Sequence, residues 1–552
     1  MVNGQQSTDN GQWRKTLETL KTLKTLETLK VAPTSNIYII MNYKYSCLLA
    51  FLCSIFSMEV VGGVINDSLQ YRVEVSATTA VEGAAPMWLV SNKYGLSSLQ
   101  DASGYVRLGV AQPAFHFTSS KNWKLGYGID LVAPINHATE NAVTGKQRTN
   151  FIIQQLYADL DFKWLRLSVG AKERPMELKH QRLSSGSQTF GINARPVPGV
   201  RLEIPEYVSL TGKKNPWLAI KGHFSYGMMT DGAWQEAYVS SKGRWADKAL
   251  LHTKAGYMRL GNPEKFPLIL EGGLEMATQF GGTIYNPTGR AGHYGEKLEM
   301  GQGPKDFIDA IFGLGSDATD GNFLNAAGNT LGSWLFSLTY QAKDWSVRAY
   351  YDHFFEDHSM MFFQYGWLDG MIGLECKFPK NKFVNTFVYE YIKTDYQGGP
   401  VYHDHTPEIS DQISGRDNYY VHNLYQGWQH WGQPMGNPLF TSALYTSDAN
   451  LTIPSNRFTA HHFGLEGSPA EGLNYRLMLS YATHLGTYYL PYLNRKYMTS
   501  GLAEVDYNFA HFSSLKDKGW QAAFGLGFDR GAQVGDNLGF TLSIKKTGLL
   551  LK

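Results

Sequence analysis

One short pattern recurs between residues 69 and 546: about ten residues alternate between apolar and polar, and a polar turn or loop follows. Successive side chains of a β-strand point to opposite faces, so each such segment has one apolar and one polar surface. In residues 520–529 the apolar set is Trp520, Ala522, Phe524, Leu526 and Phe528, and the other set is Gln521, Gly525, Gly527 and Asp529. Residues 123–131 alternate in the same way.

Segments of about 9–11 alternating residues that are numerous and rich in aromatics are typical of a transmembrane β-barrel. About eighteen strand candidates are present, and an even number suits a closed antiparallel barrel that leaves no strand edge in lipid. They lie near residues 70–79, 105–112, 123–132, 152–162, 165–172, 199–209, 218–227, 250–260, 268–280, 332–341, 345–354, 370–378, 384–393, 458–467, 475–483, 502–509, 520–528 and 538–546. The expected fold is therefore all-β, an outer-membrane barrel.

The composition agrees with a membrane location. Charged residues make up 18% of the chain, below the ~25% usual for soluble proteins. The 33 Tyr and 13 Trp belong to types that favour membrane–water interfaces. A mean hydropathy of −0.29 fits as well, because the inward residues of a barrel offset its lipid-facing ones. With a net charge of +2 and no basic cluster after residue 30, a nucleic-acid partner is not expected.

The first 63 residues differ from the rest of the chain. Residues 16–30 read as five copies of Thr-Leu-Glu/Lys, whose period of three places no continuous apolar stripe on a helix. From Met41 the sequence has a basic Lys44, an apolar run at 47–56 and small residues at 61–63, which predict a secretory signal peptide at 41–63. Residues 1–40 are interpreted as a mis-called or disordered extension, with a membrane anchor as the alternative, and 64–552 as a single barrel domain.

Three cysteines are present, and two of them, Cys47 and Cys53, fall within the predicted signal peptide. Cys376 is then the single cysteine of the predicted mature chain, so no intramolecular disulfide is expected. Its place in a strand candidate favours a packing role.

The connections between the strand candidates are unequal. Residues 342–344, 379–383 and 468–473 are tight turns, whereas 230–249, 285–331 and 396–457 are long. Outer-membrane barrels place short turns on the periplasmic side and long loops outside, and long loops usually carry function. Two stretches outside the strands, 304–312 and 85–102, are expected to be helical, the second against one mouth of the barrel.

Catalytic signatures are absent from the sequence: there is no G-x-S-x-G, no HExxH, no phosphate loop and no dinucleotide fingerprint. We therefore expect no enzyme, no catalytic residue and no cofactor. The cluster Asp352, His353, Glu356, Asp357 and His358 has residue types that could bind a metal, but strand alternation splits it between two faces, so a polar lumen or rim network is favoured. The same interpretation applies to the run from His403 to His405, and no metal site is predicted.

Residues 416–439, inside the longest loop, combine aromatic rings with Asn, Gln and His. Sugars present flat C–H faces and rims of hydroxyls, which aromatic rings and planar amides can match. The alternative is a loop that packs on itself or an aromatic girdle. The candidate polysaccharide-binding residues are Tyr419, Tyr420, Tyr425, Trp428 and Trp431.

The sequence also resembles the Wzi family of outer-membrane capsule-assembly proteins, in the form found among Bacteroides-type bacteria. The matching stretches are Pro86-Met-Trp-Leu-Val-Ser-Asn-Lys-Tyr-Gly95, 209–231, 328–334, 351–359, Trp367-Leu-Asp-Gly370, 416–439 and 546–548. The resemblance implies an eighteen-stranded barrel with short periplasmic helical elements and a surface lectin that helps retain capsular polysaccharide. It implies no enzyme. A porin or polysaccharide export channel is the first alternative function, and a barrel-embedded hydrolase is the second.

We predict that the mature chain begins close to Val64, because small residues follow the apolar run there. N-terminal sequencing of the protein from outer membranes is the measurement. Recovery of residues 1–30 on that protein would contradict both the start at Met41 and the signal peptide.

Overall fold

The computed structural model describes residues 68–550 apart from 142–144, 149–150, 213–215, 263, 288–294, 315–327, 357–360, 362–368, 380, 404–411, 447, 488 and 512–518. The predicted extension and signal peptide lie outside the described residues, as do Asp357, His358, Asp404 and His405. Ile65–Lys552 form one compact unit.

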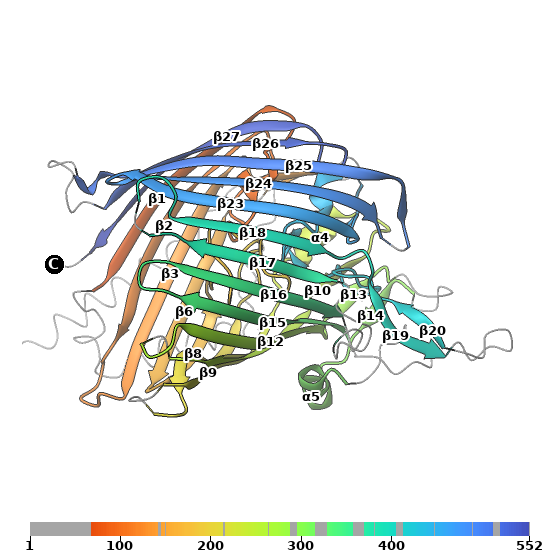
Figure 1. Ribbon diagram of the computed structural model, residues 1–552. Coiled ribbons are helices and arrows are strands. Elements are labelled where there is room, and N and C mark those ends of the chain that lie inside the picture. Colours follow the sequence, from red (N-terminus) through yellow and green to blue (C-terminus); the bar gives the residue numbers. More distant parts are fainter. Residues whose placement is uncertain are drawn as a thin grey trace, which may run out of the picture. The chain divides into compact units, whose positions relative to one another are not determined.

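This unit contains a closed antiparallel β-barrel of eighteen strands (Figure 1). Each strand pairs with its neighbours in the chain, and the first strand closes the barrel by pairing with the last. The strands are β1 (Gln70–Glu82), β2 (Ala102–Phe115), β3 (Trp123–Ile135), β6 (Ile152–Phe162), β7 (Leu165–Ala171), β8 (Gly199–Ser209), β9 (Leu218–Met228), β11 (Leu250–Leu260), β12 (Leu268–Phe280), β15 (Asn329–Gln341), β16 (Ser346–Glu356), β17 (Gly370–Lys377), β18 (Thr386–Lys393), β23 (Phe458–Ala470), β24 (Leu473–Gly486), β25 (Pro491–Asn508), β26 (Trp520–Arg530) and β27 (Asn537–Leu549).

All the predicted strands are present, so the barrel fold predicted from the sequence is confirmed. The largest difference is β25, which begins at Pro491 instead of near residue 502. Its first half contains Asn494, Arg495 and Lys496 in succession, so no alternating pattern marks it. Pairing with β24 extends the strand over this part: Lys496 pairs with His484 and Pro491 with Gly486, with a register shift between the two pairs.

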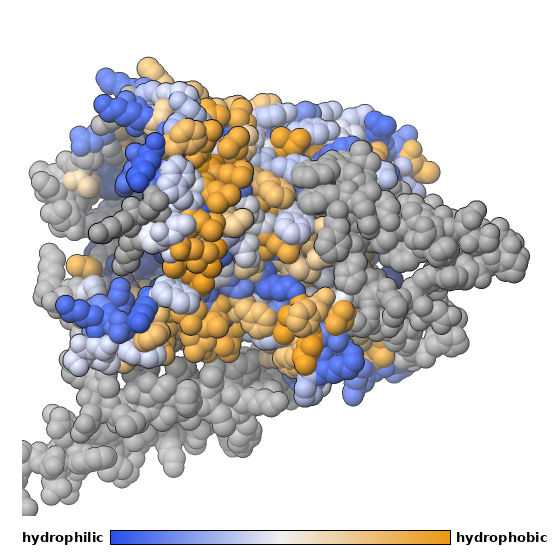
Figure 2. Space-filling model, turned by 60° about the horizontal axis from the view of Figure 1, so that its bottom comes forward, coloured by the Kyte–Doolittle hydropathy of each residue, from blue (hydrophilic) through white to orange (hydrophobic). Residues whose placement is uncertain are grey.

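The alternation in sequence is an alternation between lumen and outer surface. In β26, Phe524 is 48% exposed on the outside, whereas Asp529 is fully buried on the inside. Apolar side chains form an exposed belt across the outer face of the strands (Figure 2). A belt of this kind is what a barrel presents to lipid acyl chains.

The long connections all lie at one end of the barrel. They follow β1, β3, β7, β9, β12, β16 and β18. The connections at the other end are shorter, and β1 begins and β27 ends there. The long connections contain α3 (Met87–Val90), α4 (Gly232–Tyr238), α5 (Pro304–Phe312), η2 (Ala443–Tyr445) and the short strands β4 (Ala138–Asn141), β5 (Gly145–Arg148), β10 (Trp245–Asp247), β13 (Thr283–Tyr285), β14 (Lys297–Glu299), β19 (Gly398–His403), β20 (Gln412–Arg416), β21 (Gln429–His430) and β22 (Gln433–Pro434).

The helices differ in part from expectation. The helix predicted at 304–312 is confirmed as α5. In the stretch 85–102, only α3 is α-helical, and it lies inside the barrel against β25 and β26 instead of against a mouth. The resemblance implied helical elements on the short-turn side, but in the described part of the chain that side has only the short 3-10 helix η3 (Phe509–His511). No helix among the described residues is long and apolar enough to cross a bilayer.

We predict that Phe524→Arg costs about 2–4 kcal/mol of folding free energy, because the side chain would place a charge on the lipid-facing surface. Gln521→Arg on the opposite face of β26 serves as the matched control and should cost far less. The measurement is folding in lipid vesicles, followed by urea titration. Equal losses in the two variants would contradict the assignment of faces.

Candidate functional site

A segment between β7 and β8, residues 172–198, contacts inward-facing side chains of distant strands and therefore lies in the lumen. Its Lys179 forms an ion pair with Asp352 of β16 at 3.1 Å, with the two side chains 1% and 0% exposed. The ammonium also lies 4.7 Å from the centroid of the Tyr350 ring. Removing one partner of such a buried pair costs about 3–5 kcal/mol, so this contact holds the segment to the wall.

A second group of contacts fixes the tip of the 172–198 segment. The Ser184 hydroxyl and the Ser185 backbone N–H donate to the carboxylate of Glu390 on β18, at 2.6 and 2.8 Å. The Leu183 carbonyl lies 2.8 Å from a ring nitrogen of the buried His462 on β23. A Cβ at Gly464 would lie 2.6 Å from that carbonyl oxygen, so the glycine permits the close approach.

Residues 417–446, from the connection between β18 and β23, pack against the 172–198 segment. The Trp428 indole N–H donates to the Thr189 carbonyl at 2.8 Å, and the Asn437 amide donates to the Gly186 carbonyl at 3.1 Å. The Tyr420 hydroxyl donates to the Gln188 carbonyl. The two segments therefore interlock, and we call them together the plug.

The third inward element is α3, which is held by β24 and β26. The backbone N–H of Met87 donates to Asp529 of β26 at 2.9 Å, and the Trp88 indole donates to the Ser480 hydroxyl at 3.2 Å. Leu89 lies against Gly527, where a Cβ would come within 2.8 Å of its side chain.

The structure places the five predicted sugar-binding residues in the plug. Four of them are buried, with exposed fractions of 0–1%, while Trp431 is partly exposed. Tyr419 shows the role of the buried rings: burial raises its pKa well above the ordinary value, and the neutral hydroxyl donates to Asp369 at 3.2 Å. In this arrangement the four buried rings, Tyr419, Tyr420, Tyr425 and Trp428, serve packing and have no face open to a sugar.

Trp431 lies in a small aromatic and cationic cluster that the sequence did not single out. Its ring centroid is 5.9 Å from that of Trp234 in α4, and the guanidinium carbon of Arg195 lies 4.4 Å from it. Burial lowers the pKa of Arg195 to about 10, so the guanidinium stays charged at neutral pH and a cation–π contact forms. The backbone N–H of Trp431 donates to Asp231 at 2.8 Å. The contacts between residues 195, 234 and 431 arise only in the folded chain.

The His430 ring contacts the backbone of Arg195 and Thr230, next to this cluster. Burial lowers its pKa, so the ring is neutral. Its Nδ1 lies 2.9 Å from the Arg195 carbonyl and its Nε2 3.3 Å from the Thr230 backbone N–H. This pattern assigns the proton to Nδ1, which donates while Nε2 accepts.

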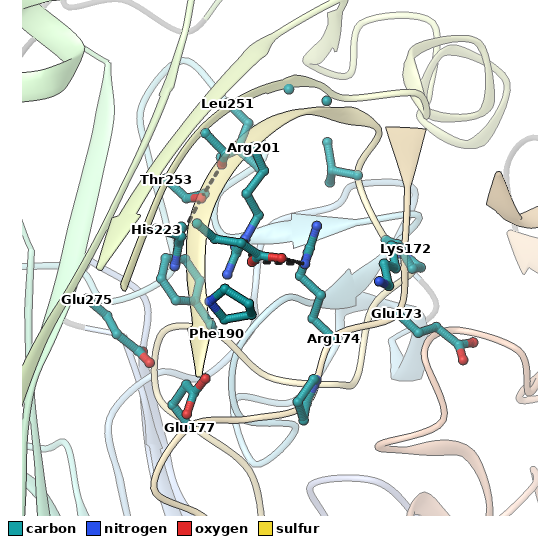
Figure 3. Close-up of a pocket in the computed structure, with 18 of the residues that line it drawn as sticks. Lys172, Glu173, Arg174, Glu177, Phe190, Arg201, His223, Leu251, Thr253 and Glu275 are labelled. Carbon is teal, nitrogen blue, oxygen red and sulfur yellow. Dashed lines mark hydrogen bonds and ion pairs between the residues drawn. The ribbon is translucent and has the colours of Figure 1, made fainter. Parts of the chain in front are cut away.

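A cavity of about 370 Å³ lies between the plug and the wall formed by β7, β8, β9 and β11 (Figure 3). Arg174 of the plug donates to Glu203 of β8 at 3.0 Å, and Arg201 donates to the same carboxylate at 2.6 Å. Two guanidinium groups thus share one carboxylate. His223 and Phe190 pack beside them, with ring centroids 5.5 Å apart. The cavity can hold a polar or anionic solute. The sequence signal that could have indicated this site is the pair Arg201 and Glu203, which are two residues apart in β8 and therefore lie on the same face.

The predicted polar interpretation of residues 352–356 agrees with the described structure. Asp352 faces the lumen and pairs with Lys179, while His353 on the opposite face lies 3.3 Å from the Asp369 carbonyl. Glu356 accepts the backbone N–H of Tyr420 at 2.6 Å. Within the described ranges no group of three or more His, Cys, Asp or Glu is placed to hold a metal ion.

Comparisons with known proteins give structural similarity alone. No protein-family model matches the chain, and no curated protein matches it. The chain is similar to Wzi of Escherichia coli, a carbohydrate-binding β-barrel involved in group 1 capsule assembly, with 15% identity, a TM-score of 0.47 and coverage of 96% of this chain and 91% of that chain. It is also similar to OccK2 of Pseudomonas aeruginosa in complex with glucuronate (8% identity, TM-score 0.44, coverage 88% and 98%) and to OprD of the same organism (8%, 0.42, 88% and 96%). Values this low establish no family membership.

Proposed function

We propose that this protein is an integral outer-membrane, lectin-like protein that binds surface polysaccharide and supports assembly or retention of a capsule. Its partners are the capsular or extracellular polysaccharide and the lipid of the outer membrane. The proposal rests on the sequence resemblance described above and on one structural observation, the interlocked plug in the lumen.

The plug favours a binding protein over an open channel. It is held to three strands of the wall through Asp352, Glu390 and His462, and all three side chains are fully buried. Each buried, charged or hydrogen-bonded contact is costly to leave unpaired, so displacement of the plug is strongly unfavourable. A barrel with a fixed plug offers its outer mouth as a binding surface.

For the sugar platform we retain Trp431 and add Trp234. Both rings are partly exposed and lie in the long connections. Trp431 has a backbone φ of +53°, a conformation that bulky residues rarely adopt and that costs about 1–3 kcal/mol. A strained, partly exposed aromatic residue beside a second ring and a guanidinium group suits recognition of a glycan.

The alternative function is a porin or export channel, and the charged cavity beside the plug favours it. Basic residues outnumber acidic ones by one in the lining of the cavity, which includes Arg166, Lys172, Arg174, Arg195, Arg201 and Lys221 and also Glu173, Glu177, Glu203, Glu206 and Glu275. A passage for small anionic solutes would need such groups. A lectin with a fixed plug and a porin differ in the ion conductance of the barrel.

We predict that the purified protein is nearly silent in planar lipid bilayers, because the plug occupies the lumen. Lys179→Ala should produce frequent conductance steps, since it leaves the buried Asp352 without its partner. Lys248→Ala is the control: its side chain is 61% exposed in an ion pair, so its loss should leave the recordings unchanged. Large, steady steps from the unaltered protein would favour the porin.

We predict that Trp431→Ala combined with Trp234→Ala releases polysaccharide from cells, with a loss of affinity of about tenfold from the two lost rings. Trp428→Ala is unsuitable for this test, because truncating a buried Trp costs about 3–5 kcal/mol of stability.

The measurement compares cell-bound and shed polysaccharide in wild type, the double variant, a deletion strain and Trp164→Ala. Trp164 is an exposed Trp in a short turn at the other end of the barrel, so its loss should have no effect. Unchanged retention in the deletion strain refutes the anchoring role. Unchanged retention in the double variant alone excludes the Trp431 platform.

A further inference from the structure

Helix α5 lies on the outer face of the barrel. Thr253 and Tyr257 of β11 line the lumen cavity, so the alternate residues of that strand, among them Lys254 and Met258, point outward. The register of β11 with β12 places Thr278 on the same outer face. Of these outward-facing side chains, Lys254 and Thr278 contact α5, and Figure 1 shows the helix at the margin of the barrel.

The barrel wall satisfies the backbone of α5. The Tyr226 hydroxyl donates to the Phe307 carbonyl at 2.8 Å, and the Thr278 hydroxyl donates to the Ala310 carbonyl at 3.3 Å. The Lys254 ammonium donates to the Ile311 carbonyl. The last carbonyls of a helix have no partner within it, and the helix dipole favours a cation there. The wall therefore holds α5 in a fixed orientation.

Apolar side chains lie on both faces of α5: the Phe307 ring packs on Tyr226 of the wall, with ring centroids 5.1 Å apart, and other apolar side chains face away. Asp309 and Ala310 face the protein and are buried. Ile308, Phe312 and Leu314 face away, with exposed fractions of 52%, 63% and 50%. Ile308 and Phe312 are four residues apart and lie on one face of the helix. A surface helix in water normally places its apolar residues toward the protein.

The exposed apolar residues of α5 continue the lipid-facing belt. On the same wall, Met258, Leu270 and Leu338 are outward-facing and between 47% and 49% exposed. Toward the long-connection end, the outward residues include Lys254, Thr278 and Phe280, and α5 covers them there. The helix therefore covers the wall next to the exposed belt.

We propose that α5 is an interfacial anchor that lies in the boundary between the membrane and the water at the long-connection end. Ile308, Phe312 and Leu314 enter the acyl-chain region, and Lys305, which is 80% exposed and pairs with Asp309, lies at the level of the headgroups. The occupant of this surface is lipid, because the surface is continuous with the lipid-facing belt and carries the same kind of side chain. The anchor fixes the height of the long connections above the bilayer.

The experiment measures the surroundings of single nitroxide labels. In a chain whose three cysteines are replaced by serine, Ile308→Cys and Phe312→Cys are labelled and folded into vesicles of phosphatidylethanolamine and phosphatidylglycerol. Leu270→Cys is the control in lipid, and Glu299→Cys is the control in water, since both side chains are exposed on their own surfaces. Mobility on unheated gels confirms folding of each variant.

We expect labels at 308 and 312 to collide more with oxygen, which dissolves in lipid, than with a polar nickel chelate, as the label at 270 does. More frequent collision with the nickel chelate, as at 299, overturns the anchor. Low accessibility to both reagents also overturns it, because a second copy or another protein then covers the helix.

Discussion

The absence of water from the bilayer core is the constraint on which this architecture depends. A backbone N–H or C=O without a partner in hydrocarbon costs several kcal/mol, so each strand needs a neighbour on both sides. The pairing of β1 with β27 supplies the last of these partners and closes the sheet. Closure with eighteen strands then fixes a wide interior, and the rest of the molecule follows from how that interior is filled.

The segments that fill the interior are more polar than an ordinary protein core. The inward-facing side chains of the strands include carboxylates, so the plug must present donors to them. Lys179, Ser184 and Ser185 do so for Asp352 and Glu390. Contacts of this kind depend on direction as well as on distance, which gives the plug one position in the lumen. The aromatic rings of residues 417–446 then occupy the space between those contacts.

The strands could be predicted from the sequence because lipid on one side and lumen on the other impose period 2 on every strand. Phe524 and Asp529 show that signal directly. The plug could not be predicted in this way. The sequence around Tyr420 and Trp428 would look the same for a loop that folds into the lumen and for a loop that faces water. Only the contacts with Gln188 and Thr189 show that this loop folds into the lumen. The cluster at Trp431 needs Arg195 and Trp234 from two other connections, and no local pattern in the sequence links them.

The interlocking of the plug also has a consequence for how the chain reaches its final state. Trp428 and Thr189 are 239 residues apart in sequence, and Tyr420 and Gln188 are 232 apart. Contacts over such separations form slowly, because a long loop must close before they contribute any stability. The 172–198 segment is made early in synthesis, yet its partners Asp352, Glu390 and His462 arrive much later. We therefore expect the lumen to be sealed as one of the last events of folding, after both halves of the barrel wall exist.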